Sequence, residues 1–317
     1  MQRALWFGFL RSSEKFADRS ALFAGGKFLK YSELRAGACR VAATIQAHVD
    51  PSETTLTAVF AYRSPTTFIG VLGSLLAGNG YVPLNRTFPI ERTQMMLERS
   101  GCRSIIVDEG SLPQLNKLLE TASAPLLVLT PDALDFASHK QQWPQHTFLV
   151  GHELKPAELW REPAFELDSI AYLLFTSGST GIPKGVAVAQ RNVTAFLDYM
   201  VERYEITESD RLSQMFDMTF DLSVFDMFVA WERGACVFCP SQKTLIKPGK
   251  FIKDSELTIW FSVPSTAVFM RQLGMLKPAQ YPSLRLSLFC GEPLPVSSAT
   301  AWLSGSVRPH SPREGNR

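Results

Sequence analysis

Strand-like and helix-like segments alternate through the first half of this 317-residue chain, and this pattern restricts the possible folds more than any other feature. Short aliphatic runs bounded by turn residues predict strands, and the amphipathic runs between them predict helices. Because parallel strands need a crossover connection, such alternation favours a parallel sheet covered by helices. The expected strands are residues 57–61, 81–84, 104–108 and 126–129, and the expected helices are residues 34–47, 65–76, 90–99 and 112–119.

Length and charge exclude several classes of protein. A chain of this length with 45% hydrophobic residues exceeds the usual size of one domain, so we expect two packed lobes. A net charge of +2 is too small to indicate a nucleic-acid or anionic-membrane partner. The longest largely apolar run, residues 68–77, is too short to span a membrane. Residues 1–10 lack the cleavage site of a signal peptide. We therefore expect a cytoplasmic protein.

The cysteines and histidines do not predict a metal site. The five cysteines are odd in number and scattered, which suits reduced thiols. Cys236 and Cys239 form a lone Cys-x-x-Cys pair, and two buried strand positions explain it better than zinc or redox chemistry. The five histidines show no ligand spacing.

Periodicity is lost over residues 131–163, where proline, glutamine, histidine and tryptophan gather. This composition is typical of a connection between lobes. We therefore expect a first α/β lobe with its connecting segment over residues 1–169 and a second α/β lobe over residues 170–302. Residues 303–317 are polar and basic without periodicity, and we expect them to be disordered.

A loop rich in glycine and hydroxyl residues follows a short apolar run at residues 172–175, which itself predicts a buried strand. Gly178 and Gly181 permit backbone conformations that turn several N–H groups toward one point, and hydroxyl groups surround them. Lys184 adds a positive charge, so the loop is suited to phosphate. The candidate phosphate-binding residues are Thr176, Ser177, Gly178, Ser179, Thr180, Gly181 and Lys184.

The spacing of this loop excludes two common nucleotide motifs. A Walker A loop needs glycine directly before its lysine and serine or threonine directly after it, whereas Lys184 stands between Pro183 and Gly185. The loop also contains no Gly-x-Gly-x-x-Gly fingerprint. A lone Ser-Gly-Ser-Thr-Gly would more simply be a flexible surface turn. Here, however, the strand, both glycines, the proline and the lysine occur in order.

In this form, residues 175–185 resemble the signature loop of the adenylate-forming superfamily, which includes acyl-CoA synthetases, luciferases and the adenylation domains of nonribosomal peptide synthetases. The family pattern is Tyr/Phe-Thr-Ser-Gly-Ser/Thr-Thr-Gly-x-Pro-Lys-Gly, and the chain fits it without a departure. Residues 76–84 and 88–92 resemble a second family motif, which we interpret as scaffold. The resemblance implies an α/β fold with two stacked, mostly parallel sheets flanked by helices. It also implies that the loop holds the β- and γ-phosphates of ATP.

The apolar segment at residues 215–226 contains three aspartates. A carboxylate in such surroundings costs free energy unless it is paired, so at least one should meet a cation or a set of donors. Alternatively, Asp217 or Asp221 caps a helix that begins near Leu222. Residues 220–223 match the family motif Phe-Asp-x-Ser, in which the Asp of amino-acid-activating members receives the α-ammonium group. The resemblance thus implies that Asp221 binds the ammonium group of an amino acid.

The resemblance also implies the other contacts of the substrate. The adenine face would lie on Gly291, Glu292 and Pro293, whose Phe-Cys-Gly-Glu context is similar to that of D-alanine:carrier-protein ligases. Cys290 would narrow the side-chain pocket for a small or medium, largely apolar amino acid. A buried thiol at the end of a strand is the alternative interpretation of Cys290, and both can hold. The implied pocket walls are Leu222, Phe225, Ser262, Leu288 and Cys290.

The resemblance runs from about residue 22 to residue 302. A full family member would continue through a Tyr-Gly-Pro-Thr-Glu motif that helps to hold Mg²⁺ and through a small C-terminal domain with a catalytic lysine. We find neither motif here, so we assign no catalytic residue and no metal ligand, and we expect a truncated, incomplete large domain with little or no activity.

The parent reaction would join an amino acid and ATP, with Mg²⁺, into an aminoacyl-adenylate. The aminoacyl group would then pass to the phosphopantetheine thiol of a carrier protein. A fragment of an acyl- or aryl-CoA ligase is an alternative from the same superfamily. A non-catalytic nucleotide-binding remnant or a pseudogene product is an alternative from another class.

Overall fold

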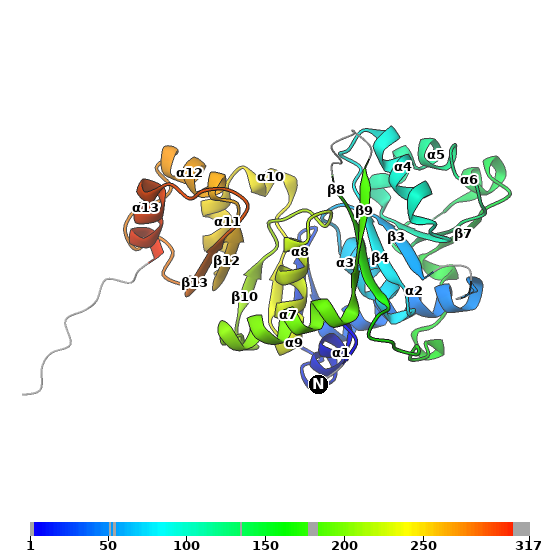
Figure 1. The fold of residues 1–317 in the computed structure, drawn as a ribbon, viewed down its shortest axis with the longest axis horizontal. Coiled ribbons are helices and arrows are strands. Elements are labelled where there is room, and N and C mark those ends of the chain that lie inside the picture. Colours follow the sequence, from blue (N-terminus) through cyan, green and yellow to red (C-terminus); the bar gives the residue numbers. More distant parts are fainter. Residues whose placement is uncertain (1–2, 51, 53–54, 134, 177–182, 307–317) are drawn as a thin grey trace, which may run out of the picture.

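The computed structural model describes residues 3–50, 52, 55–133, 135–176 and 183–306. These residues form two mostly parallel sheets flanked by helices, which confirms the predicted fold class (Figure 1). The seven-stranded sheet has the order β7-β6-β5-β3-β4-β8-β9, and the six-stranded sheet has the order β13-β12-β10-β11-β1-β2. Among the described strands, only β9 and β2 run antiparallel to the neighbours with which they pair.

The seven-stranded sheet follows from continuous apolar runs, because strands covered on both faces need no polar alternation. Every residue of β3 through β6 is buried. Helix α3 (Pro65–Leu76) begins with proline after Ser64, where the missing N–H costs nothing. The strands are β3 (Leu56–Phe60), β4 (Gly80–Leu84), β5 (Ser104–Val107), β6 (Leu127–Thr130), β7 (Thr147–Val150), β8 (Ile170–Thr176) and β9 (Lys184–Ala189).

The six-stranded sheet joins the two ends of the described chain. The N-terminal hairpin of β1 and β2 pairs with β11, in the register Leu22↔Val237. The indole Nε1 of Trp231, on the helix before β11, donates to the carbonyl of Ala21 on β1 at 3.1 Å. This bond also connects the hairpin to the rest of the sheet. The strands are β1 (Ser20–Ala24), β2 (Lys27–Lys30), β10 (Arg211–Ser213), β11 (Cys236–Phe238), β12 (Ile259–Ser262) and β13 (Leu286–Phe289).

Helices flank the faces of both sheets (Figure 1). Burial of their apolar sides against the strands forms three hydrophobic clusters, the largest of which spans both sheets. The helices are α1 (Phe7–Lys15), α2 (Tyr31–His48), α3, α4 (Ile90–Ser100), α5 (Leu112–Leu119), α6 (Ala137–Gln142), α7 (Gln190–Arg203), α8 (Leu222–Val224), the π-helix η4 (Phe225–Val229), α9 (Ala230–Arg233), α10 (Gln242–Leu245), α11 (Pro248–Asp254), α12 (Pro264–Gln272) and α13 (Val296–Ser306), with short 3₁₀ turns η1 (Glu109–Ser111), η2 (Gly151–Glu153) and η3 (Ala157–Leu159).

The expected boundaries need three corrections. The segment 131–163 is not only a connection, because it supplies β7, the edge strand that pairs with β6. The sheets do not follow the expected division at residues 169 and 170, since β8 pairs with β4 while the N-terminal hairpin joins the other sheet. Residues 303–306 continue helix α13 instead of forming a tail. Residues 307–317 lie outside the described part.

Cys236 on β11 and Cys239 directly after it are both buried, as the structural interpretation of this pair predicts, although only Cys236 lies within the strand. Burial raises the pKa of Cys236 to about 12 and that of Cys239 to about 11. Among the described residues, no helix is long and apolar enough to cross a membrane.

Candidate functional site

The hairpin of β8 and β9 carries the two ends of the predicted phosphate loop. Thr176 pairs with Lys184 in the antiparallel register, and its Oγ1 donates to the Lys184 carbonyl at 3.5 Å. Both side chains are exposed, so they are free to meet a ligand. A β-carbon on Gly185 of β9 would lie 3.0 Å from the Leu173 side chain and 3.4 Å from the Phe175 ring, so a larger residue here would have to displace these side chains slightly.

Helix α4 supports this hairpin, because Arg99 Nη1 donates to the Pro183 carbonyl at 3.4 Å. The remaining predicted phosphate-binding residues lie outside the described part of the chain; they are Ser177, Gly178, Ser179, Thr180 and Gly181.

Asp221 lies beside the strand that enters the loop. Burial, and after it the negative charge of Asp221, raise the pKa of Tyr172 on β8 to about 12. Asp217, four residues before Asp221, accepts from Asn85 directly after β4, the strand that pairs with β8. Asp221 is exposed and occupies the N-cap position of α8, but its side chain makes no capping hydrogen bond. Nor does Asp217 cap α8, because it accepts from Thr219 within the preceding turn. The capping alternative is therefore wrong for both aspartates.

The predicted pocket walls lie along one hydrophobic cluster. Phe225 is buried and packs edge-to-face on Phe261 at 5.2 Å between ring centroids. Leu222 and Leu288 are half-buried and pack against the same cluster. Ser262 is buried, and its hydroxyl is committed, since it accepts from Trp260 Nε1 at 2.9 Å and donates to the Val263 carbonyl at 3.1 Å. Ser262 can therefore shape a pocket but has no free donor for a ligand.

A cavity of about 360 Å³ opens beside these walls but shares only Ser262 with them. Its lining consists of Arg63, Met215, Phe216, Leu245, Ser262, Val263, Ser265, Thr266 and Phe269. The predicted walls and this cavity therefore lie next to each other without coinciding.

The predicted adenine loop follows β13. Cys290 is exposed, so its interpretation as a buried thiol is wrong. Gly291 has a φ of 96°, in the left-handed region that favours glycine. Glu292 Oε2 accepts from the backbone N–H of Ser265 at 3.0 Å, which fixes the loop against the start of α12. Gly291, Glu292 and Pro293 are all exposed and available to a planar ligand.

Sequence reasoning missed two residues that connect the sheets near Asp221. Arg63 and Asn85 stand just after β3 and β4 and contact the segment at residues 214–217 that follows β10. The sequence feature that could predict them is a polar residue at the carboxyl end of a parallel strand. Ligands, and the residues that position them, commonly lie at this edge of a sheet. Asn85 directly follows residues 76–84, the motif that the sequence predicts to be scaffold.

Comparisons with known proteins show the family to which the chain belongs. The family model described as "AMP-binding enzyme" matches residues 9–308. The chain is 32% identical over 241 residues to an L-proline–[L-prolyl-carrier protein] ligase of Pseudomonas fluorescens, covering 75% of this chain and 46% of that protein. It is 28% identical over 287 residues to a D-alanine–D-alanyl carrier protein ligase of Bacillus velezensis, covering 87% of this chain and 51% of that protein.

Two solved structures are also similar. The Vibrio cholerae adenylation domain AlmE in complex with glycyl-adenosine-5'-phosphate has a TM-score of 0.87 and 30% identity, covering 96% of this chain and 58% of that one. IdnL7 has a TM-score of 0.83 and 34% identity, covering 96% of this chain and 59% of that one. The chain spans about half the length of the curated relatives that it matches.

Proposed function

Because the chain belongs to the AMP-binding enzyme family, we propose that it supplies the binding surfaces for ATP-dependent activation of an amino acid. The carboxylate of the amino acid attacks the α-phosphorus of ATP, the bond to pyrophosphate breaks, and an aminoacyl-adenylate forms. The aminoacyl group then passes to the phosphopantetheine thiol of a carrier protein. The relatives named as carrier-protein ligases support this acceptor.

The observation that carries the proposal is the proximity of Asp221 to β8. Asn85, directly after the strand that pairs with β8, donates to Asp217 at 2.7 Å, four residues before Asp221. Burial and then the charge of Asp221 raise the pKa of Tyr172, on the strand that enters the phosphate loop. An amino acid whose ammonium group binds to Asp221 would present its carboxylate to the loop. Orientation of two reactants in this way is a large part of such catalysis. A fatty acid has no ammonium group to use this charge, so Asp221 favours an amino acid over an acyl-CoA ligase substrate.

The other predicted residues bind the remaining groups of the two substrates. Thr176, Lys184 and the loop between them bind the phosphates, while Gly291, Glu292 and Pro293 face the adenine. Leu222, Phe225, Ser262, Leu288 and Cys290 shape the side-chain pocket. ATP in such reactions is accompanied by Mg²⁺, but the described residues include no group of three or more His, Cys, Asp or Glu side chains that could hold a metal ion. The predicted residues of this chain bind and orient the two reactants.

Calorimetric titration of the purified chain tests the proposal. The probes are ATP and non-hydrolysable sulfamoyl analogues of aminoacyl-adenylates, compared with a fatty-acyl sulfamoyl analogue. We expect the wild-type chain to prefer an aminoacyl probe. Asp221→Asn keeps the size of the side chain but removes its charge, so it should weaken aminoacyl binding about tenfold or more and leave fatty-acyl binding unchanged.

Asp254→Asn on α11 is the matched control, because Asp254 is another exposed carboxylate that pairs only with Lys250. If the chain binds the fatty-acyl probe more tightly, and Asp221→Asn does not change this preference, the result would favour an acyl-CoA ligase instead. Failure to bind ATP at millimolar concentration would favour a non-catalytic remnant.

A further inference from the structure

Side chains of the seven-stranded sheet hold the segment at residues 214–217, which leads from β10 to Asp221. Arg63 Nη2 donates to the Met215 carbonyl at 2.6 Å, and its Nη1 donates to the Gln214 carbonyl at 3.2 Å. Asn85 Nδ2 donates to Asp217 Oδ2 at 2.7 Å. Because Arg63 and Asn85 follow β3 and β4, the carboxyl edge of one sheet holds a loop of the other.

The orientation of the Asn85 amide is fixed. The backbone N–H of Thr87 donates to Asn85 Oδ1 at 2.7 Å, and an N–H group can only donate. The oxygen must therefore face Thr87, which leaves Nδ2 to face Asp217. Asn85 is 4% exposed, so water does not compete freely for this contact.

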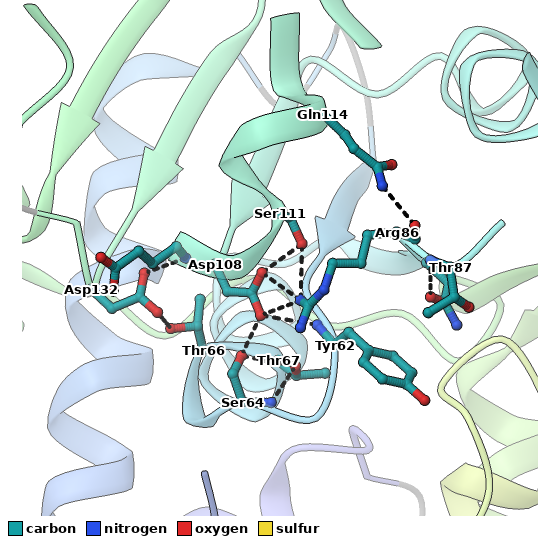
Figure 2. Close-up of polar contacts among 12 residues, drawn as sticks. Tyr62, Ser64, Thr66, Thr67, Arg86, Thr87, Asp108, Ser111, Gln114 and Asp132 are labelled. Carbon is teal, nitrogen blue, oxygen red and sulfur yellow. Dashed lines mark hydrogen bonds and ion pairs between the residues drawn. The ribbon is translucent and has the colours of Figure 1, made fainter. Parts of the chain in front are cut away.

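Asp108 holds the loop that carries Asn85. Its carboxylate, 2% exposed, forms an ion pair with Arg86 Nη1 at 3.0 Å. Gln114 Nε2 donates to the Arg86 carbonyl at 2.9 Å, and Figure 2 shows both contacts converging on this loop. The residue next to Asn85 is thus fixed through both its side chain and its backbone.

The same carboxylate fixes the chain on both sides of Arg63. Asp108 Oδ2 accepts from the Tyr62 N–H at 3.1 Å and from the Ser64 hydroxyl at 2.8 Å (Figure 2). Arg63 itself has a φ of 52°, a left-handed conformation that is uncommon for a residue with a side chain. One buried carboxylate therefore organises both of the contacts that hold residues 214–217.

Hydrogen bonds in the turn that follows Asp217 connect this fixed residue to Asp221. Its Oδ1 accepts from the N–H of Thr219 at 3.0 Å and from the Thr219 hydroxyl at 2.6 Å. Its carbonyl accepts from the Phe220 N–H at 3.0 Å, and the Phe220 carbonyl in turn accepts from the Ser223 hydroxyl at 2.7 Å. Asp221 therefore stands at the end of a turn in which Asp217, Thr219 and Phe220 are hydrogen-bonded.

Resting on the function proposed above, we propose that Asn85 and Asp217 are positioning residues that hold Asp221 in register with strand β8. Asn85 follows β4, and β4 pairs with the loop-bearing strand β8 in the register Tyr81↔Tyr172. The Asn85–Asp217 bond thus ties the ammonium-binding carboxylate to the sheet that binds the phosphates. Its loss should weaken aminoacyl binding while binding of ATP alone is kept.

Three variants test the bond. Asn85→Asp places two carboxylates opposite each other, and Asp217→Asn places two amide groups there. The double variant Asn85→Asp/Asp217→Asn restores one donor and one acceptor with reversed direction. We expect each single variant to bind the best aminoacyl sulfamoyl probe about tenfold to a hundredfold more weakly, ATP within about twofold, and the double variant to recover most of the loss.

Asn79→Asp is the matched control. Asn79 is 6% exposed, lies at the other end of β4 and donates to Thr57 Oγ1 at 3.0 Å, away from residues 214–217. It should cost comparable stability without changing the ratio of aminoacyl to ATP affinity. If Asn85→Asp does not fold, Asp217→Asn at its half-buried site provides the same comparison.

Hydrogen exchange gives a readout that does not depend on the proposed function. The amide hydrogens of Thr219 and Phe220 should exchange about tenfold faster in the single variants, and the double variant should restore protection. Aminoacyl binding that falls in Asp221→Asn but not in the Asn85 or Asp217 variants, with unchanged exchange, would overturn this inference alone. Absence of aminoacyl binding by the wild-type chain would instead overturn the proposed function, and the exchange data would still decide whether the bond orders this turn.

Discussion

Asp210 shows how one buried carboxylate can be kept charged. It is 3% exposed, and burial alone would raise its pKa, but Arg285 and neighbouring donors hold the pKa below its usual value. Arg285 reaches both oxygens, with Nε to Oδ1 at 2.8 Å and Nη2 to Oδ2 at 2.7 Å. This bidentate pair connects the start of β10 to the start of β13.

Arg285→Gln should destabilise the fold by about 2–4 kcal/mol at pH 7, because it leaves Asp210 buried without its cation. A carboxyl whose folded pKa is lowered contributes stability above its unfolded pKa, near 4, and loses that contribution as pH falls through the folded pKa. The difference between wild type and variant should therefore shrink below about pH 4. Urea unfolding at several pH values measures it, and a difference independent of pH would contradict this account.

The π-helix η4 contains a second buried carboxylate, that of Asp226, whose pKa is raised instead of lowered. Asp226 is 1% exposed, and neither of its oxygens has a hydrogen-bond partner of normal geometry. Burial raises its pKa well above the usual value, although the Met215 backbone and the Arg63 guanidinium partly favour the charged form. A π-helical turn is uncommon, and here it directs an acidic side chain into the core.

Asp226→Asn should therefore stabilise the protein at alkaline pH. A raised folded pKa means that wild type loses stability as pH rises above the unfolded value near 4, and asparagine does not share this loss. We expect a gain of about 1–2 kcal/mol at pH 8 that disappears near pH 4. Thermal unfolding across this range measures the gain, with the exposed Asp254→Asn as the control. Equal destabilisation at both pH values would show that Asp226 is paired.

Sequence patterns predict the bounds of a helix or strand well where clear start and stop residues flank it. The predicted bounds of α3 match, because Pro65 follows the capping residue Ser64 and the apolar run ends at Leu76. Strand β7 was missed, since four residues among polar and aromatic neighbours become a strand only through their pairing with β6. For the same reason the sequence could not predict the Asn85–Asp217 bond, whose partners are 132 residues apart.

The proposed site would need both sheets, since the predicted phosphate hairpin belongs to one and the predicted pocket walls belong mostly to the other. Ligand binding that needs this arrangement should stabilise the folded chain by mass action, and each tenfold loss of affinity should remove about 1.4 kcal/mol of that stabilisation.

Lys184→Ala should therefore reduce the rise in melting temperature that saturating ATP causes, because the loop loses its cation at an exposed position and the fold keeps its contacts. Differential scanning fluorimetry with and without ATP measures this rise. Lys253→Ala on α11, far from the hairpin, should leave it unchanged. The idea would be wrong if both variants responded to ATP as wild type does.

The pairing of the N-terminal hairpin with β11 has a consequence for synthesis of the chain. Ala21 and its partner Trp231 are separated by 210 residues. At ordinary ribosomal speeds, the nascent hairpin waits roughly 10–40 seconds for that partner. All strands of the seven-stranded sheet emerge before β11 does. During this interval Phe23 and Phe28, which later pack around Phe238, form an uncovered aromatic surface that a ribosome-associated chaperone can recognise.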